Sequence, residues 1–138
     1  TEKMEAEGVH VPATLEELYA NCDYISLHIP ANEKTKGSIN YELLSKMPKG
    51  GCLVNTARKE VIDEAGMEKL LAERTDLKYV TDIAPANQAA LEQFAPRFFA
   101  TPKKQGAETA EANMNAGLAA ARQIVGFIER GETKFKVN

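Results

Sequence analysis

The sequence lacks any segment that could cross a membrane, and it is poor in cysteine. No run approaches the roughly 18 consecutive apolar residues of a membrane-spanning helix, so we expect no membrane association. Cys22 and Cys52 are too few for a disulfide framework, and each stands in an apolar or helical stretch. We therefore expect two reduced thiols. No apolar segment follows the charged residues of the first five positions, so we expect a cytoplasmic protein without a secretory signal.

An excess of positive charge and the common ligand-binding motifs are also missing. Seventeen Lys and Arg residues against twenty Asp and Glu residues give a net charge of −3, whereas nucleic-acid binders usually carry a basic face. We expect no nucleic-acid partner. No Cys/His cluster has zinc spacing and no carboxylate set resembles a calcium loop, so we predict no metal site. Neither a G-x-G-x-x-G nor a Walker A motif is present, so these residues lack a glycine-rich phosphate loop.

The 138 residues alternate short apolar runs with segments that favour helices. Hydrophobic residues make up 43% and charged residues 27%, which is ordinary for a globular chain able to bury a core. Strands are predicted at 23–30, 52–55, 77–82 and 98–100, and helices at 15–21, 41–46, 64–74 and 108–130, with a turn of helix near Leu91. Thr14, Asn40 and Asp63 are the expected helix caps, and Gly131 the expected stop. The alternation favours a parallel sheet built from right-handed βαβ units.

Parallel sheets bind ligands beyond the carboxyl ends of their strands, so candidate site residues should follow each predicted strand. Arg58 follows the second strand, and its guanidinium could bind a carboxylate with two parallel hydrogen bonds. The alternative is a surface arginine paired with Glu60 or Glu64. Spacing alone leaves both interpretations open.

Other strand ends also carry polar side chains. Asp82 could accept a hydrogen bond from a ligand amide, or it could cap the next turn. Lys103 or Lys104 could act as a general base if partly desolvated, or the two could be a solvated pair. His28 is expected to shape the edge of a pocket rather than to transfer a proton.

Five groups of residues resemble one protein family in order and spacing. They lie at 27–30 with Thr35, at 55–58 with 62–64, at 81–82, at 101–102 and at 106–109. The family is that of the NAD-dependent D-isomer-specific 2-hydroxyacid dehydrogenases, and the resemblance covers about residues 13–138. Within the family, residues 102–113 are most similar to the branch of short-form D-3-phosphoglycerate dehydrogenases.

The resemblance implies an α/β fold: the second half of a Rossmann-type, doubly wound parallel sheet followed by a long C-terminal helix. Residues 1–107 would be part of an NAD-binding domain that lacks its glycine-rich half. Residues 108–138 would form the long helix and tail that return toward a substrate domain. The chain would then be a fragment of a longer enzyme and inactive by itself.

The resemblance also implies how these residues meet the cofactor, NAD. His28 and Pro30 would line the adenosine side of the NAD site. Thr56 and Ala57 would bring main chain against the nicotinamide end, and Asp82 would hold the nicotinamide carboxamide.

The implied catalytic residues are Arg58 and Lys103. Arg58 would bind the substrate carboxylate and polarise the C2 carbonyl. The family normally pairs a His with a Glu, but here Lys103 stands at the His position and Asn87 at the Glu position. A neutral lysine can take the hydroxyl proton, and a neighbouring carboxylate would raise a lysine pKa that is already high, so the two changes are consistent. Lys104 is the alternative base.

The implied reaction is hydride transfer from C2 of D-3-phosphoglycerate to NAD, the first step of serine synthesis, in a homodimer. The alternative is a non-catalytic, NAD-binding regulatory member of the same fold family that lost the usual His–Glu pair. Retention of Arg58 and Asp82 favours the enzyme.

The predicted long helix carries a broad apolar arc. One stripe contains Met114, Leu118, Ala121, Val125 and Ile128, and a second contains Ala116, Ala120, Ile124 and Phe127. The arc is wider than the face that covers a single sheet. The resemblance implies that one side of the arc has lost its partner here, so we expect a second copy of the chain to cover it, or the helix to swing away or fray near its end.

Overall fold

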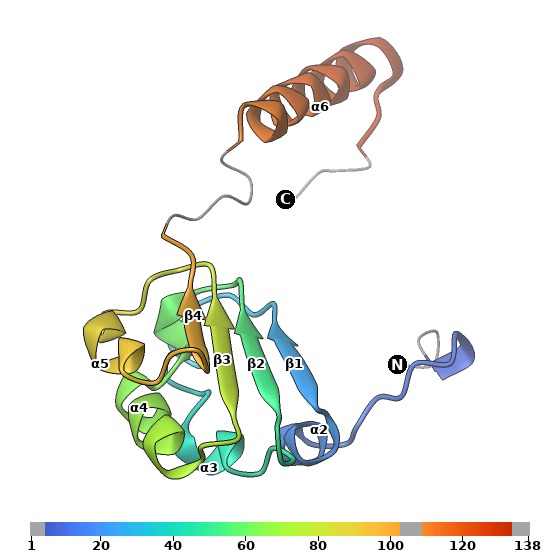
Figure 1. Ribbon diagram of the computed structural model, residues 1–138. Coiled ribbons are helices and arrows are strands. Elements are labelled where there is room, and N and C mark those ends of the chain that lie inside the picture. The colour runs from blue at the N-terminus through green and yellow to red at the C-terminus, as the bar shows by residue number, and fades with distance from the viewer. Residues whose placement is uncertain (1–4, 103–108, 134–138) are drawn as a thin grey trace. The chain divides into compact units, whose positions relative to one another are not determined.

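The computed structural model describes residues 5–102 and 109–133. The chain divides into two compact units, Thr1–Lys103 and Lys104–Asn138. The first contains a sheet with its helices and the second contains one long helix (Figure 1).

The first unit is built on one parallel sheet of four strands. These are β1 (Tyr24–Leu27), β2 (Cys52–Asn55), β3 (Lys78–Thr81) and β4 (Phe98–Ala100), and they pair in the order β1-β2-β3-β4. The register places Leu27 beside Asn55, Asn55 beside Thr81, and Thr81 beside Ala100. All four carboxyl ends therefore meet at one edge of the sheet (Figure 1), and the predicted α/β fold with a parallel sheet is confirmed.

The helices of this unit begin close to the predicted caps. They are α2 (Leu15–Asn21), α3 (Tyr41–Leu44), α4 (Glu64–Glu73) and α5 (Gln88–Glu92), with a 3₁₀ turn η1 (Lys59–Val61) that was not predicted. Thr14 Oγ1 accepts from the amide of Glu17 at 3.1 Å, and Asn40 Oδ1 accepts from Leu43 at 3.0 Å. The capping role expected for the Asp63 side chain is wrong, because it makes no such bond.

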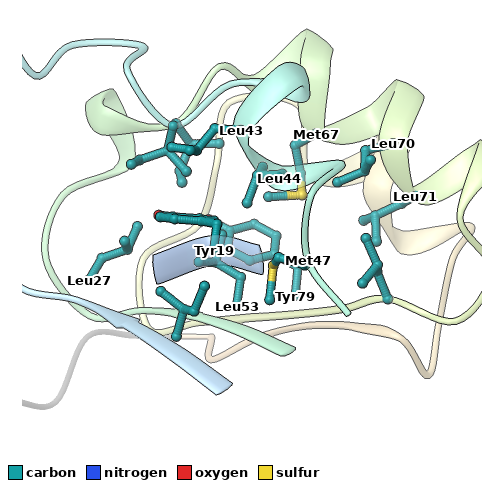
Figure 2. Close-up of a cluster of buried hydrophobic side chains, with 14 of the residues drawn as sticks. Tyr19, Leu27, Leu43, Leu44, Met47, Leu53, Met67, Leu70, Leu71 and Tyr79 are labelled. Carbon is teal, nitrogen blue, oxygen red and sulfur yellow. The ribbon is translucent and has the colours of Figure 1, made fainter. Parts of the chain in front are cut away.

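The core lies between one face of the sheet and helices α2, α3 and α4 (Figure 2). Alternation along the strands puts a row of buried residues on this face: Ile25, Leu53, Tyr79 and Phe98. The helices add Tyr19, Leu44, Met67, Leu70 and Leu71, each at most 2% exposed. Each fully buried aliphatic side chain contributes roughly 1.5–3 kcal/mol. On the opposite face, Tyr24 is 79% and Phe99 56% exposed.

A salt bridge braces the amino end of the sheet. Arg74 donates two hydrogen bonds to the carboxylate of Asp76, at 2.9 and 2.7 Å, and further bonds to the carbonyls of Ser45 at 3.1 Å and Met47 at 3.2 Å. The amide of Gly50 donates to the same carboxylate at 2.9 Å. The bonds from Arg74, followed by the bond from Gly50, hold the pKa of Asp76 well below its usual range.

Arg97 closes the carboxyl end of helix α4 beside this brace. Its guanidinium donates to the carbonyls of Leu71 at 2.9 Å, Arg74 at 3.2 Å and Leu77 at 3.3 Å. The last carbonyls of a helix have no partner within the helix, so an external donor is needed when they are buried. Arg97 supplies it.

Strand β1 is shorter than predicted. It ends at Leu27, which pairs with Asn55, the last residue of β2. His28 and the two residues after it therefore have no strand beside them and turn away from the sheet as a loop.

The second unit contains helix α6 (Ala110–Arg130). Thr109 Oγ1 caps it by accepting from Ala112 at 3.1 Å, which moves the start two residues beyond the prediction, and Gly131 ends it at φ 65° as predicted. The large apolar residues of the arc are exposed: Met114, Leu118, Ile124, Val125, Phe127 and Ile128 are 47–75% exposed. Over residues 5–102 and 109–133, no helix is long and apolar enough to span a membrane.

Candidate functional site

A pocket of about 500 Å³ opens at the carboxyl ends of β1 and β2. Its lining is His28, Ile29, Pro30, Ala31, Thr56, Ala57 and Arg58. Five of the seven residues predicted for the site therefore lie around one hollow. They meet because two adjacent parallel strands end at the same register and each continues into a loop.

The β1 side of the pocket is shaped by hydrogen bonds within one turn. Asn32 Oδ1 accepts from the amides of Lys34 at 2.9 Å and Thr35 at 3.1 Å. The Thr35 hydroxyl donates to the carbonyl of Pro30. His28 is exposed, and its Nε2 lies 2.9 Å from Ser26 Oγ. Through the bond from its hydroxyl, Thr35 holds the main chain of Pro30 at the rim of the pocket.

The β2 side is shaped by a buried asparagine. Asn55 is 0% exposed. Its Oδ1 accepts from the amide of Ala57, and its Nδ2 donates to the carbonyl of Arg58, both at 3.0 Å. These two bonds turn the chain at Thr56, so that 56–58 face the pocket.

Arg58 presents an exposed guanidinium to this pocket. Its only hydrogen bond among the described residues goes from Nη1 to the carbonyl of Ala57, at 2.9 Å. The ion pair with Glu60 or Glu64, considered from spacing, is not formed within residues 5–102 and 109–133. Glu64 instead accepts from the amide of Ala86 at 2.9 Å. The arginine can therefore offer its planar set of donors to an anion.

Asp82 lies one strand further along and does not line the pocket. Its Oδ1 is buried and has no hydrogen-bond partner among the described residues. The capping role considered for Asp82 falls to Thr81, whose Oγ1 accepts from the amide of Ile83 at 3.1 Å. A buried acceptor without a donor costs roughly 1–3 kcal/mol. Asp82 is therefore suited to a donor supplied by a ligand, such as an amide.

Lys103 and Lys104, the candidate bases, lie outside the described residues, but the position paired with Lys103 is described. Asn87 Nδ2 donates to the carbonyl of Glu64 at 3.0 Å, and its Oδ1 is another buried atom without a partner among the described residues. Asn87 therefore ties the loop between β3 and α5 to the first turn of α4.

Two polar residues of the site, Asn55 and Thr81, belong to the groups that carry the family resemblance, but no role was predicted for either. They are 0% and 1% exposed and lie side by side at the ends of β2 and β3. The signal was available: each polar residue falls where strand alternation predicts a buried side chain, and such groups require hydrogen-bond partners.

The geometry agrees with comparisons to known proteins. Residues 1–103 match the family described as "D-isomer specific 2-hydroxyacid dehydrogenase, NAD binding domain". The crystal structure of NAD⁺-bound 3-phosphoglycerate dehydrogenase from Entamoeba histolytica superposes with a TM-score of 0.79 and 47% identity, over 99% of this chain and 50% of that chain. D-3-phosphoglycerate dehydrogenase from Methanocaldococcus jannaschii is 33% identical over 135 residues, which cover 95% of this chain and 25% of that protein.

The Haemophilus influenzae D-3-phosphoglycerate dehydrogenase is 29% identical over 135 residues, or 91% of this chain and 32% of the relative. The chain thus spans about a third or less of these two curated relatives and half of the solved structure. The predictions of the family, of an oxidoreductase family and of NAD as its cofactor are confirmed. The chain belongs to the NAD-dependent D-isomer-specific 2-hydroxyacid dehydrogenases, within whose NAD-binding domain residues 1–103 fall.

Proposed function

We propose that this chain is part of an NAD-dependent dehydrogenase that oxidises the C2 hydroxyl of D-3-phosphoglycerate. The observation that carries the proposal is an exposed Arg58 guanidinium, with one hydrogen bond among the described residues, in a pocket of NAD-domain residues. It lies one strand from Asp82, whose buried Oδ1 has no partner among the described residues. The similarity to the Entamoeba histolytica 3-phosphoglycerate dehydrogenase supports this substrate over other 2-hydroxy acids.

The residues present suit the cofactor. Asp82 Oδ1 offers an unused acceptor for the carboxamide of the nicotinamide. Thr56 and Ala57 lie in the same pocket and would contact the nicotinamide end through main chain, whereas His28 and Pro30 would line the adenosine side. When bound, NAD supplies the hydride acceptor. The phosphates need a glycine-rich loop from another part of the enzyme.

Arg58 and Lys103 have separate roles in this proposal. Arg58 forms a two-pronged contact with the substrate carboxylate and stabilises the negative charge that develops on the C2 oxygen. Lys103, in its neutral form, takes the proton of the C2 hydroxyl as the C2 hydride leaves, and the product is 3-phosphohydroxypyruvate. Asn87 is neutral, so unlike a glutamate at this position it would not raise the pKa of a neighbouring Lys103.

The organisation of the complete enzyme is part of the same proposal. Residues 1–107 complete the NAD-binding domain, and residues 108–138 return the chain toward a substrate domain. The enzyme would act as a cytoplasmic homodimer in serine biosynthesis. The exposed arc of α6 supports a packing partner outside the described residues.

The experiment that tests this function uses the complete enzyme with D-3-phosphoglycerate and NAD. We expect NADH formation that Lys103→Ala nearly abolishes, with NAD affinity unchanged. Lys104→Ala is the matched control and should act mainly on the KM for the substrate. Lys103→His should not restore normal activity, because Asn87 cannot support an imidazolium as a glutamate would.

Two results would replace this proposal. A complete protein that binds NAD but turns over no 2-hydroxy acid would be the regulatory member of the family considered above. A fully active Lys103→Ala would remove Lys103 as the base.

A further inference from the structure

Asn55 joins the two loops that carry the proposed binding residues. Its side chain serves the loop after β2, with one bond to the Ala57 amide and one to the Arg58 carbonyl. Its own carbonyl faces β3, where it accepts from the hydroxyl of Thr81 at 2.9 Å and from the amide of Asp82 at 3.3 Å. A single residue therefore contacts both the Arg58 loop and the first residue of the Asp82 loop.

The network around Asn55 is buried and its polar groups are paired. Asn55 is 0%, Thr81 1% and Tyr79 2% exposed. Burial raises the pKa of Tyr79, and the neighbouring side chains of Asn55 and Thr81 oppose this rise. Thr81 Oγ1 also lies 3.0 Å from the carbonyl of Ile83, so the same hydroxyl shapes the turn after β3. A buried network in which each member is paired favours one arrangement of its backbone, because each broken bond leaves a desolvated group.

Hydride transfer depends on the distance between the two loops. In the proposed function, Arg58 holds the substrate and Asp82 holds the nicotinamide, so the separation of their loops sets the separation of the reacting carbons. A displacement of 1 Å at such a site can cost about a hundredfold in rate. We propose that Asn55, supported by Thr81, is a positioning residue that fixes the Arg58 loop relative to Asp82. This inference rests on the proposed function and adds two positioning residues to it that are not among its proposed ligand contacts.

The kinetic test removes each part of the network in the complete enzyme. Asn55→Ala and Thr81→Val should each lower kcat by about tenfold or more, while the Kd for NAD and the KM for substrate change much less. The isotope effect on kcat with substrate deuterated at C2 should rise, because misplacement slows the hydride step. Thr81→Ser keeps the hydroxyl and should recover most of the activity.

A matched control separates positioning from loss of stability. Leu71→Ala removes a core side chain, 1% exposed, near the amino end of the sheet, and we expect a lower Tm without a change in kcat or in the isotope effect. If Asn55→Ala and Thr81→Val behave like Leu71→Ala, the positioning role is wrong. If Asn55→Ala does not fold, the nearly isosteric Asn55→Asp replaces it in the same measurements.

Hydrogen exchange tests the coupling without turnover. In Thr81→Val of the complete protein, amides at 56–58 should exchange faster, although the substitution lies on the neighbouring strand. Unchanged exchange there would overturn the coupling even in an active enzyme. An inactive wild-type protein would refute the proposed function alone, and faster exchange at 56–58 would still support the link between the loops.

Discussion

The two ends of the sheet use arginine in opposite ways. At the amino end, Arg74 donates to Asp76 and to main-chain carbonyls, and Arg97 donates to three carbonyls around the end of α4. At the carboxyl end, the guanidinium of Arg58 makes one hydrogen bond among the described residues, to the carbonyl of its own neighbour Ala57. The paired arginines stabilise the fold, and the arginine with donors to spare is the one suited to a ligand.

Unpaired acceptors follow the same division. Asp82 Oδ1 and Asn87 Oδ1, both in the loop after β3, are buried without a partner among the described residues. At the amino end, the carboxylate of Asp76 is fully engaged by Arg74 and Gly50. A folded chain rarely leaves a buried polar atom unpaired, so these two acceptors are suited to donors from outside the described residues.

Arg58→Ala gives the sharpest test of this contrast. In the complete enzyme it should lower kcat/KM by at least about a hundredfold, the scale of one lost charged contact in a dry site. Tm should barely change, because no other side chain depends on Arg58. Arg58→Lys should restore little, since an ammonium lacks the planar pair of donors. Lys59→Ala removes a charge from the next residue, outside the pocket lining, and is the matched control. Near-normal kinetics for Arg58→Ala would make Arg58 a surface residue.

Arg74→Ala should have the converse effect. It leaves Asp76 with the Gly50 amide as a donor and removes the donor to the carbonyls of Ser45 and Met47. We expect a loss of roughly 1.5–3 kcal/mol in the free energy of unfolding. Steady-state kcat/KM measured well below the Tm should stay near normal, because the brace lies at the opposite end of the sheet from the pocket. Denaturant titration measures the change in the free energy of unfolding, and initial rates on the same sample measure the change in kcat/KM. A larger effect on kcat/KM than on stability would contradict the separate roles assigned to the two ends of the sheet.

The sequence predicted the strands and the residues that follow them better than the side-chain contacts at the amino end of the sheet. The strands at 52–55 and 98–100 were placed at their observed bounds, because turn residues and apolar runs delimit them. Parallel strands must end together, so the residues after β1 and β2 could be expected to share a pocket, as His28 and Arg58 do. Where β1 ends could not be read locally, since that depends on the length of its neighbour β2.

The braces at the amino end were not predictable for a physical reason. Arg74 and Arg97 bind carbonyls that lie 20–29 residues away, and a carbonyl acceptor leaves no mark in the sequence. The missed 3₁₀ turn at Lys59–Val61 has no apolar periodicity of its own. Asp63 has the right type and position for a cap, but its carboxylate lies against the first turn, where a side chain at Gly66 would meet it at 2.5 Å.

The pH dependence of stability tests the Asp76 brace. Since its pKa is lowered in the folded protein, Asp76 stabilises the fold above the pKa of about 3.9 that an aspartate has when unfolded. That stability is lost as the pH falls through the lower pKa of the folded state. We expect wild type to be more stable than Asp76→Asn at pH 7 and the difference to shrink below about pH 4. Denaturant midpoints of both proteins across that range measure it, and a constant difference would contradict the assignment.

Tyr19→Phe tests whether an unpaired buried atom must signal a ligand. The hydroxyl of Tyr19 is the third such atom among the described residues, but it lies within the apolar core between α2 and the sheet (Figure 2). Burial raises the pKa of Tyr19 to about 12. Removing the hydroxyl should leave stability unchanged or raise it by about 1 kcal/mol, as measured by denaturant unfolding. Asp82→Asn, by contrast, should weaken NAD binding in the complete enzyme. A destabilised Tyr19→Phe would mean that the hydroxyl has a partner, and the unpaired buried atoms among the described residues would then be those of Asp82 and Asn87 alone.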